Sequence, residues 1–142
     1  PPYFPPGTAV ASEREQAVPA RIEVRGDVRD YAAAAARILA PGGVFAFVFP
    51  YARRTDADAA LSGAGLTLLR RRDVVFREGD DPLIALFAAS RSEDLPSTFE
   101  PGGEGAPWIE PLLTIRRRDG SIHPEYALVR MSFGFPPGNV KG

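Results

Sequence analysis

The stretch that decides the fold is DVRDYAAAAARILAPGGVFAFVF, residues 27–49. Its first half predicts a helix over residues 27–39, because Asp27 is a good N-cap and Asp30 places a second negative charge at the positive end of the helix dipole. Pro41 and the pair Gly42-Gly43 end that helix. The apolar positions that repeat with the helical period, and that we expect to form one buried stripe, are Val28, Tyr31, Ala35, Ile38 and Leu39.

The second half of the stretch, residues 44–49, is apolar at every position. A strand that is apolar on both faces is typical of a parallel sheet covered by helices on both sides. Helix, glycine turn and strand together make half of a βαβ unit, which indicates the α/β fold class. Ligands of open α/β sheets bind at the carboxyl ends of the strands, where Pro50 and Tyr51 follow. For Tyr51 we favour ring packing at the sheet edge over catalysis.

The next segment predicts a helix and then a hairpin. Residues 56–64 predict a shorter amphipathic helix, and Gly65 stands where a C′ glycine ends a helix. Residues 67–76 predict a strand whose centre is the charged run Arg70-Arg71-Arg72-Asp73, which is typical of an edge strand. After a turn at residues 78–82, residues 83–89 are again continuously apolar and predict an inner strand. Because no helix separates them, the two strands should pair antiparallel.

The end of the chain has its own turn and helix. Residues 90–111 predict a long loop or tether, and the apolar run from residue 112 predicts a strand. Asp119-Gly120 is a hairpin turn signal, and residues 124–130 predict a short helix with Pro124 in its first turn. We therefore divide the chain into a main part at residues 1–90, a linker at 91–111 and a hairpin and helix extension at 112–142.

Composition limits the classes of protein. The 142 residues suffice for one modest domain, and 17 Lys and Arg balance 18 Asp and Glu, so no overall charge attracts nucleic acid. Without cysteine there is no disulfide or thiolate metal site, and a single histidine, His123, cannot build a histidine cluster, so we predict no metal. No apolar run approaches the roughly 20 residues of a membrane span, so we expect a cytoplasmic protein.

The sequence begins Pro1-Pro2-Tyr3-Phe4. Two prolines fix an extended backbone, and the fixed φ presents a carbonyl as a preorganised hydrogen-bond acceptor. An aromatic ring directly after them could stack on a flat group and align it for reaction. The alternative is a proline-rich end without a role, since chain ends are usually disordered.

Taken in order, several features resemble the second half of a class I methyltransferase. They are the Pro-Pro-Tyr motif, the segment Ala20-Arg21-x-Glu23, a helix that ends in Leu-x-Pro-Gly-Gly, an apolar strand and a closing hairpin. The tail, with a strand, Asp119-Gly120 and Glu125-Tyr126, resembles the end of bacterial enzymes that methylate adenine N6 in a valine tRNA. The resemblance implies a Rossmann-like sheet whose last strand is inserted beside the fifth. This chain would be its C-terminal half plus an extension.

The resemblance also implies an activity: methyl transfer from S-adenosylmethionine to an exocyclic amino group, with adenine N6 in tRNA as the substrate and RNA binding as a consequence. The family motif is Asn-Pro-Pro-Tyr, so its Asn would stand one position before Pro1. That Asn side chain and the Pro1 carbonyl would accept hydrogen bonds from the amino group and localise its lone pair. The implied catalytic residues are Pro1, Pro2 and Tyr3, with Tyr3 stacking on the substrate.

Substrate contacts are implied for Phe4, Arg21 and Glu23, although Ile22 replaces the histidine of the family. The glycine-rich turn and the acidic residue that hold S-adenosylmethionine would lie in the preceding half of the domain. The glycines at residues 102–105 lie in a proline-bearing loop and favour a linker. We therefore expect the chain alone to be inactive, and its open sheet edge to need the preceding half or a partner.

Alternatives stay open. A protein glutamine N-methyltransferase would present the same planar NH2 group to the same motif. A non-catalytic module could use the exposed sheet edge to capture a partner strand. Another doubly wound enzyme, such as a reductase, would need phosphate-binding glycines outside this chain. The arginine runs at residues 70–72 and 116–118 mildly favour a phosphate-bearing substrate, but strand alternation divides each run between two faces, so we favour solvated decoration.

Overall fold

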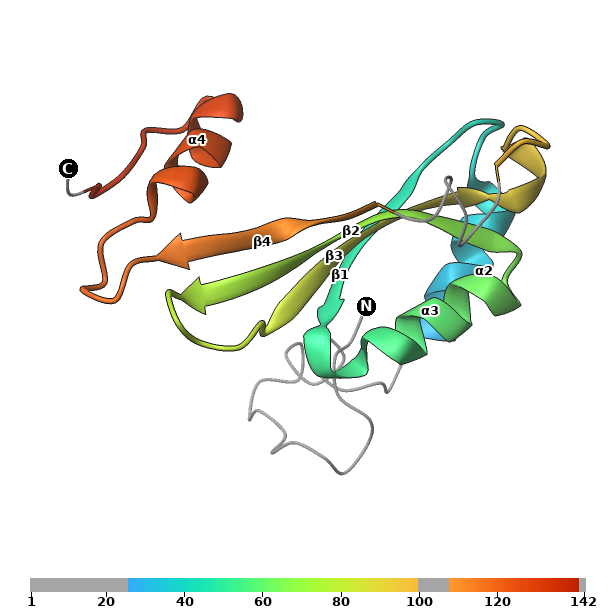
Figure 1. The fold of residues 1–142 in the computed structure, drawn as a ribbon. Coiled ribbons are helices and arrows are strands. Elements are labelled where there is room, and N and C mark those ends of the chain that lie inside the picture. Colours follow the sequence, from blue (N-terminus) through green and yellow to red (C-terminus); the bar gives the residue numbers. More distant parts are fainter. Residues whose placement is uncertain (1–25, 100–107, 141–142) are drawn as a thin grey trace.

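A computed structural model describes residues 26–99 and 108–140. This part of the chain is an α/β structure, in which helices pack on a four-stranded mixed sheet (Figure 1). The helices and strands, in chain order, are α2 (Val28–Ile38), β1 (Phe45–Pro50), α3 (Arg54–Gly63), β2 (Leu66–Arg77), β3 (Ile84–Arg91), β4 (Trp108–Arg116) and α4 (Pro124–Ser132). Two short 3₁₀ turns, η1 (Tyr51–Arg53) and η2 (Ser92–Asp94), follow β1 and β3.

The strand order is β1-β3-β2-β4. β3 is antiparallel to both of its neighbours, whereas β2 and β4 are parallel, so β1, β2 and β4 point in one direction. The predicted antiparallel hairpin and the inner position of its second strand are confirmed. In space the second strand of the hairpin, β3, lies between β1 and the first strand, β2.

The prediction that residues 67–76 form an edge strand is wrong, because β4 pairs along the far side of β2. The charges at its centre are tolerated because each arginine there meets a carboxylate. Arg70 pairs with Glu110 of β4, and Arg72 with Glu125 of α4. Arg71 pairs with Asp73 on its own strand, with Nε 3.0 Å from Oδ1. The charged residues at the centre of β2 therefore lie on an inner strand and not on an edge strand.

The start of α2 follows its sequence closely. Asp27 Oδ1 accepts hydrogen bonds from the backbone N–H groups of Arg29 (2.8 Å) and Asp30 (3.2 Å), and Asp30 Oδ2 accepts one from Asp27 N–H at 3.0 Å. This is a complete capping box, in which Asp30 takes the place of the usual glutamate. The predicted N-cap is confirmed.

The buried stripe of α2 differs from its prediction. Val28, Ala32 and Ala35 are buried, whereas Tyr31 is 40% exposed and Ile38 is 82% exposed. Small side chains let the helix approach the sheet closely, so the alanines occupy the contact. The larger apolar residues are left at the rim of the helix, where they remain accessible.

The core lies between the sheet and the two helices α2 and α3, which cover one of its faces (Figure 1). Phe47 and Phe49 of β1 are buried there, and Phe47 stacks on Phe87 of β3 with ring centroids 4.8 Å apart. On the opposite face of β1, Ala46 is exposed and Val48 is only half-buried. In the described part of the chain, β1 is therefore buried on one face, and the expected burial of both faces is not met.

The Gly42-Gly43 turn before β1 is tied to the end of β3. Gly42 N–H donates to Asp94 Oδ2 at 3.0 Å, and Arg91 Nε donates to the same oxygen at 3.0 Å. These donors hold the pKa of the Asp94 carboxyl below its usual range. Ser90 Oγ donates to the carbonyl of Gly43 at 2.8 Å. Side chains from β3 and η2 thus fix the path of the chain into β1.

The C-terminal segment extends the sheet. β4 begins at Trp108, so the predicted loop at residues 90–111 ends earlier than expected. The Asp119-Gly120 turn is confirmed: Gly120 has φ +85°, and Arg117 N–H donates to the Ser121 carbonyl at 2.9 Å. The predicted short helix is confirmed as α4, with Pro124 at its start. None of the described helices is long and apolar enough to cross a membrane.

Candidate functional site

The site residues predicted from the sequence lie outside the described part of the chain. This holds for Pro1, Pro2, Tyr3, Phe4, Arg21 and Glu23, and also for the glycines at residues 102–105. Their proposed roles therefore remain predictions. Two features of the described residues bear on function. One is the end of the sheet at which ligands of α/β proteins bind, and the other is a pocket that the sequence did not indicate.

The carboxyl ends of β1, β2 and β4 share one end of the sheet. Directly after β1, Tyr51 packs half-buried against the core, and its N–H donates to the Leu83 carbonyl at 3.0 Å. The Arg54 guanidinium lies 4.2 Å from the centroid of the Tyr51 ring and donates to the Tyr51 carbonyl at 3.1 Å. The ring is covered by its neighbours, which agrees with the packing role expected for Tyr51.

The two arginine runs differ in their surroundings. Arg70, Arg71 and Arg72 are all paired with carboxylates, as described above. In the second run, Arg116 Nη1 donates to the Gly120 carbonyl at 2.7 Å, so it closes its own turn. Glu78 accepts a hydrogen bond from the Arg118 N–H at 3.4 Å, which brings the acidic turn after β2 against the basic one after β4. The run at residues 70–72 therefore serves the packing of the sheet, whereas Arg116 and Arg118 of the second run are exposed, in agreement with the solvated role that we favour.

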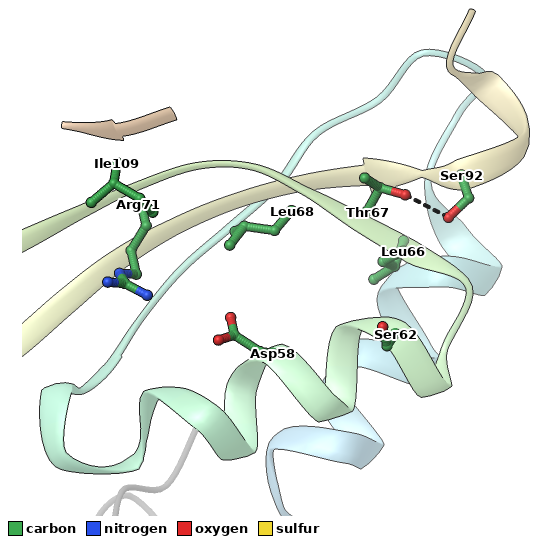
Figure 2. A pocket seen from close by; sticks show the side chains of 8 residues that line it. All are labelled: Asp58, Ser62, Leu66, Thr67, Leu68, Arg71, Ser92 and Ile109. Carbon is green, nitrogen blue, oxygen red and sulfur yellow. Dashed lines mark hydrogen bonds between the residues drawn. The ribbon is translucent and has the colours of Figure 1, made fainter. Parts of the chain in front are cut away.

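A pocket of about 350 Å³ lies between α3 and the first residues of β2 (Figure 2). We call it the Asp58 pocket. Asp58 and Ser62 reach into it from α3, one helical turn apart, and Arg71 reaches into it from β2. The remaining lining consists of the apolar side chains Leu66, Leu68 and Ile109 and the hydroxyl residues Thr67 and Ser92.

The two hydroxyl groups at one end of the Asp58 pocket are fixed. Thr67 Oγ1 lies 2.7 Å from Ser92 Oγ (Figure 2). Ser92 Oγ also donates to the Gly65 carbonyl at 3.0 Å. Arg71 is held from behind, because its Nε and Nη2 reach the two carboxylate oxygens of Asp73 at 3.0 and 3.4 Å. The walls of the pocket therefore keep their positions through the Thr67–Ser92 bond and through bonds to Gly65 and Asp73.

Asp58 differs from these neighbours. Its Oδ1 atom is buried and has no hydrogen-bond partner. Burial raises the pKa of the Asp58 carboxyl, and the positive charges of Arg71 and Arg54 offset part of that rise. A carboxylate in this position is costly for the fold, because the folded state disfavours its charged form.

The cost of burying the Asp58 carboxylate should be measurable as a change in the free energy of unfolding. Asp58→Asn is expected to raise the free energy of unfolding at about pH 7, by on the order of 0.5 kcal/mol after solvent screening. The raised pKa means that the folded state binds the Asp58 proton more tightly than the unfolded state does. The charged carboxylate therefore destabilises the fold at pH values above its pKa in the folded state. This destabilisation vanishes at pH values below its pKa in the unfolded state. The gain should therefore disappear when urea unfolding is repeated in acid. Asp56→Asn, which loses the ion pair with Arg53 at 2.9 Å, serves as the control and should show no gain at neutral pH.

Sequence reasoning missed Asp58, although one signal was present. Asp58 and Ser62 are four residues apart on the predicted helix and flank its apolar stripe of Ala57 and Leu61. A polar pair beside the buried face of a helix lies at the rim of the core, where partial burial is expected. Which strand covers that rim depends on how β2 crosses α3, and the helix pattern alone does not give that.

A second hollow lies on the other face of the sheet, beneath α4. Its volume is about 520 Å³, and it is lined by apolar and aromatic side chains. The half-exposed Phe76 of β2 and the exposed Phe133 after α4 contribute to its wall. The ion pair from Arg72 to Glu125 joins α4 to β2.

Comparison with known proteins gives no assignment. No protein-family model matches the chain, and no curated protein matches its sequence.

Proposed function

We propose that the chain is the C-terminal half of a class I methyltransferase domain with an extension at residues 112–142. The observation that supports this is the position of β3. It runs antiparallel between β1 and β2, which are parallel to each other, while α2 and α3 cover one face (Figure 1). This arrangement is compatible with the inserted last strand that the resemblance to class I methyltransferases implies. The same hairpin in a simple meander would place β2, rather than β3, beside β1.

On this proposal the protein transfers a methyl group to an exocyclic amino nitrogen, with adenine N6 in tRNA as the first candidate substrate. The Pro1 carbonyl would accept a hydrogen bond from the amino group, and Pro2 would keep that carbonyl rigid. Tyr3 would stack on the flat substrate, with Phe4, Arg21 and Glu23 contacting it further out. S-adenosylmethionine would supply the electrophilic methyl group.

The described residues do not fit a methyl donor site. Such a site needs a glycine-rich turn directly after a strand. In the described part of the chain, β1 is followed by Tyr51–Arg53, and β2 by an acidic turn that contains the single glycine Gly79. The proposal therefore places the residues that hold S-adenosylmethionine outside this part, in the preceding half of the domain.

Tyr3→Ala is the test of this proposal. In the protein read from the start codon of its gene, the change should lower kcat/KM for methyl transfer to unmodified tRNA at least tenfold, or about 1.4 kcal/mol, because stacking is lost. Tyr3→Phe should keep the ring and the activity. Tyr31→Ala, which removes a half-exposed tyrosine from α2, is the matched control and should leave the rate unchanged. Transfer of labelled methyl from S-adenosylmethionine is the measurement, and equal rates for Tyr3→Ala and the wild type would contradict the proposed site.

One observation favours the protein glutamine alternative. The arginines at residues 70–72 are neutralised by carboxylates, so this run offers no open phosphate-binding surface. If tRNA stays unlabelled while a glutamine-bearing protein such as a release factor accepts the methyl group, the substrate is a protein amide. The proposed role of the Pro-Pro-Tyr motif is then unchanged. If neither is labelled, a non-catalytic module becomes the better reading, since in the described part of the chain β1 pairs only with β3 and has a free outer edge.

A further inference from the structure

One oxygen of the Asp58 carboxyl group has no hydrogen-bond partner in the described part of the fold. Among the side-chain nitrogen and oxygen atoms of the described residues, its Oδ1 is the one that is buried and lacks a hydrogen-bond partner. Buried polar atoms in native structures are almost always paired, so this exception marks Asp58 as a candidate ligand-binding residue. The side chain faces the open space between α3 and β2 (Figure 2).

The positive charges near Asp58 are engaged elsewhere. Arg71 donates from Nε and Nη2 to Asp73, at 3.0 and 3.4 Å. Arg54 lies over the Tyr51 ring at 4.2 Å and donates to the Tyr51 carbonyl. Both arginines weaken the cost of burying the Asp58 carboxylate, but neither is bonded to it. The Asp58 pocket thus keeps one acceptor without a donor.

We propose that the Asp58 pocket binds the protonated primary amine of a small ligand. An ammonium group is a compact charge with three N–H donors, so it can donate to the Asp58 carboxylate and still reach a hydroxyl oxygen such as that of Ser62. The apolar side chains Leu66, Leu68 and Ile109 would receive the alkyl part of the ligand. The volume of about 350 Å³ suits a small molecule.

This amine site is separate from the proposed methyl transfer. Leu66 and Leu68 lie at the beginning of β2, and Ile109 near the beginning of β4. The methyl-transfer site would use the opposite end of the sheet, where the strands finish. The two proposals can therefore fail independently.

The experiment is an NMR titration of the full-length protein with n-butylammonium chloride. A ligand of this size binds weakly, with a dissociation constant expected in the millimolar range. Saturable shifts are expected at the amides of Asp58, Ser62 and Leu68. n-Butanol tests the apolar part alone, and n-butyltrimethylammonium tests charge without N–H donors; both should bind at least tenfold more weakly.

Asp58→Asn should weaken n-butylammonium binding at least tenfold, and Asp56→Asn, on the same helix, should leave it unchanged. Since Asp58→Asn is expected to be no less stable than the wild type, lost binding would not come from unfolding. Equal binding to both variants, equal binding of n-butanol, or no saturable binding to the wild type would overturn the proposal. A clear loss of stability for Asp58→Asn at neutral pH would also overturn it, because Asp58 would then have a partner within the protein.

Discussion

Replacing Phe49 by alanine is expected to lower the free energy of unfolding by about 3–5 kcal/mol. Phe49 is fully buried in β1, and the Arg53 guanidinium lies 5.1 Å from its ring centroid. Its neighbour across the sheet is Ala85, which is too small to fill the space that the ring would leave. The substitution therefore loses both the transfer free energy of the ring and the packing around it. Urea unfolding followed by far-UV circular dichroism measures the loss.

The matched control is Phe133→Ala, because Phe133 follows α4 and is 75% exposed. The same atoms are removed, but the cost should stay within about 0.5 kcal/mol, as for other surface substitutions. Should Phe49→Ala fail to fold, Phe49→Leu retains most of the volume and should cost less. Equal costs for Phe49→Ala and Phe133→Ala would contradict the assignment of the core to the space between β1 and the helices α2 and α3.

Short-range signals predicted the elements of this fold well. The Asp27 cap, the Gly42-Gly43 turn and the Asp119-Gly120 turn are each decided by a few neighbouring residues, and each is observed. The antiparallel hairpin of β2 and β3 followed from the short acidic turn between two strand patterns. Local backbone preferences were sufficient at these positions because the distant contacts, such as those from Ser90 and Asp94 to the Gly42-Gly43 turn, support the same local structure.

The predictions that are wrong for β2 and for the buried face of α2 both depend on contacts between distant parts of the chain. The charges of β2 predict an edge strand, but the carboxylates that neutralise them, Glu110 and Glu125, lie about 40 and 53 residues further along the chain. Tyr31 and Ile38 fit the helical period of α2, but the sheet selects the alanine side of that helix. The periodicity of apolar residues gives several candidate faces of the helix, and packing against the sheet decides which of them is buried.

The two candidate sites show the same difference between local sequence signals and long-range contacts. The Pro-Pro-Tyr motif is a linear signal, so sequence reasoning found it, and it stays a prediction because it lies outside the described residues. The Asp58 pocket combines residues from α3, β2, η2 and β4, none of which is unusual by itself. Its distinguishing feature is an unpaired buried oxygen, which exists only when the elements are assembled.

Arg72→Ala is expected to loosen α4 from the sheet. Arg72 is the point at which three elements meet: its Nη2 pairs with Glu125 of α4, and its Nε donates to the Pro111 carbonyl in β4 at 3.1 Å. Glu125 also accepts from Thr114 N–H at 3.4 Å. The arginine side chain is 22% exposed, so its loss leaves partly buried acceptors without a donor, at a cost of about 1–3 kcal/mol.

Hydrogen exchange separates this local effect from global unfolding. Amides of α4 and of the second half of β4 should exchange faster in Arg72→Ala, while those of α2 and β1 should keep their protection. Arg70→Ala is the matched control, because Arg70 lies on the same strand and also pairs with a carboxylate, Glu110, but is 52% exposed. Its loss should cost no more than about 1 kcal/mol. If Arg70→Ala and Arg72→Ala accelerate exchange in α4 equally, or neither does, the apolar contacts beneath α4 hold the helix and the ion pair does not.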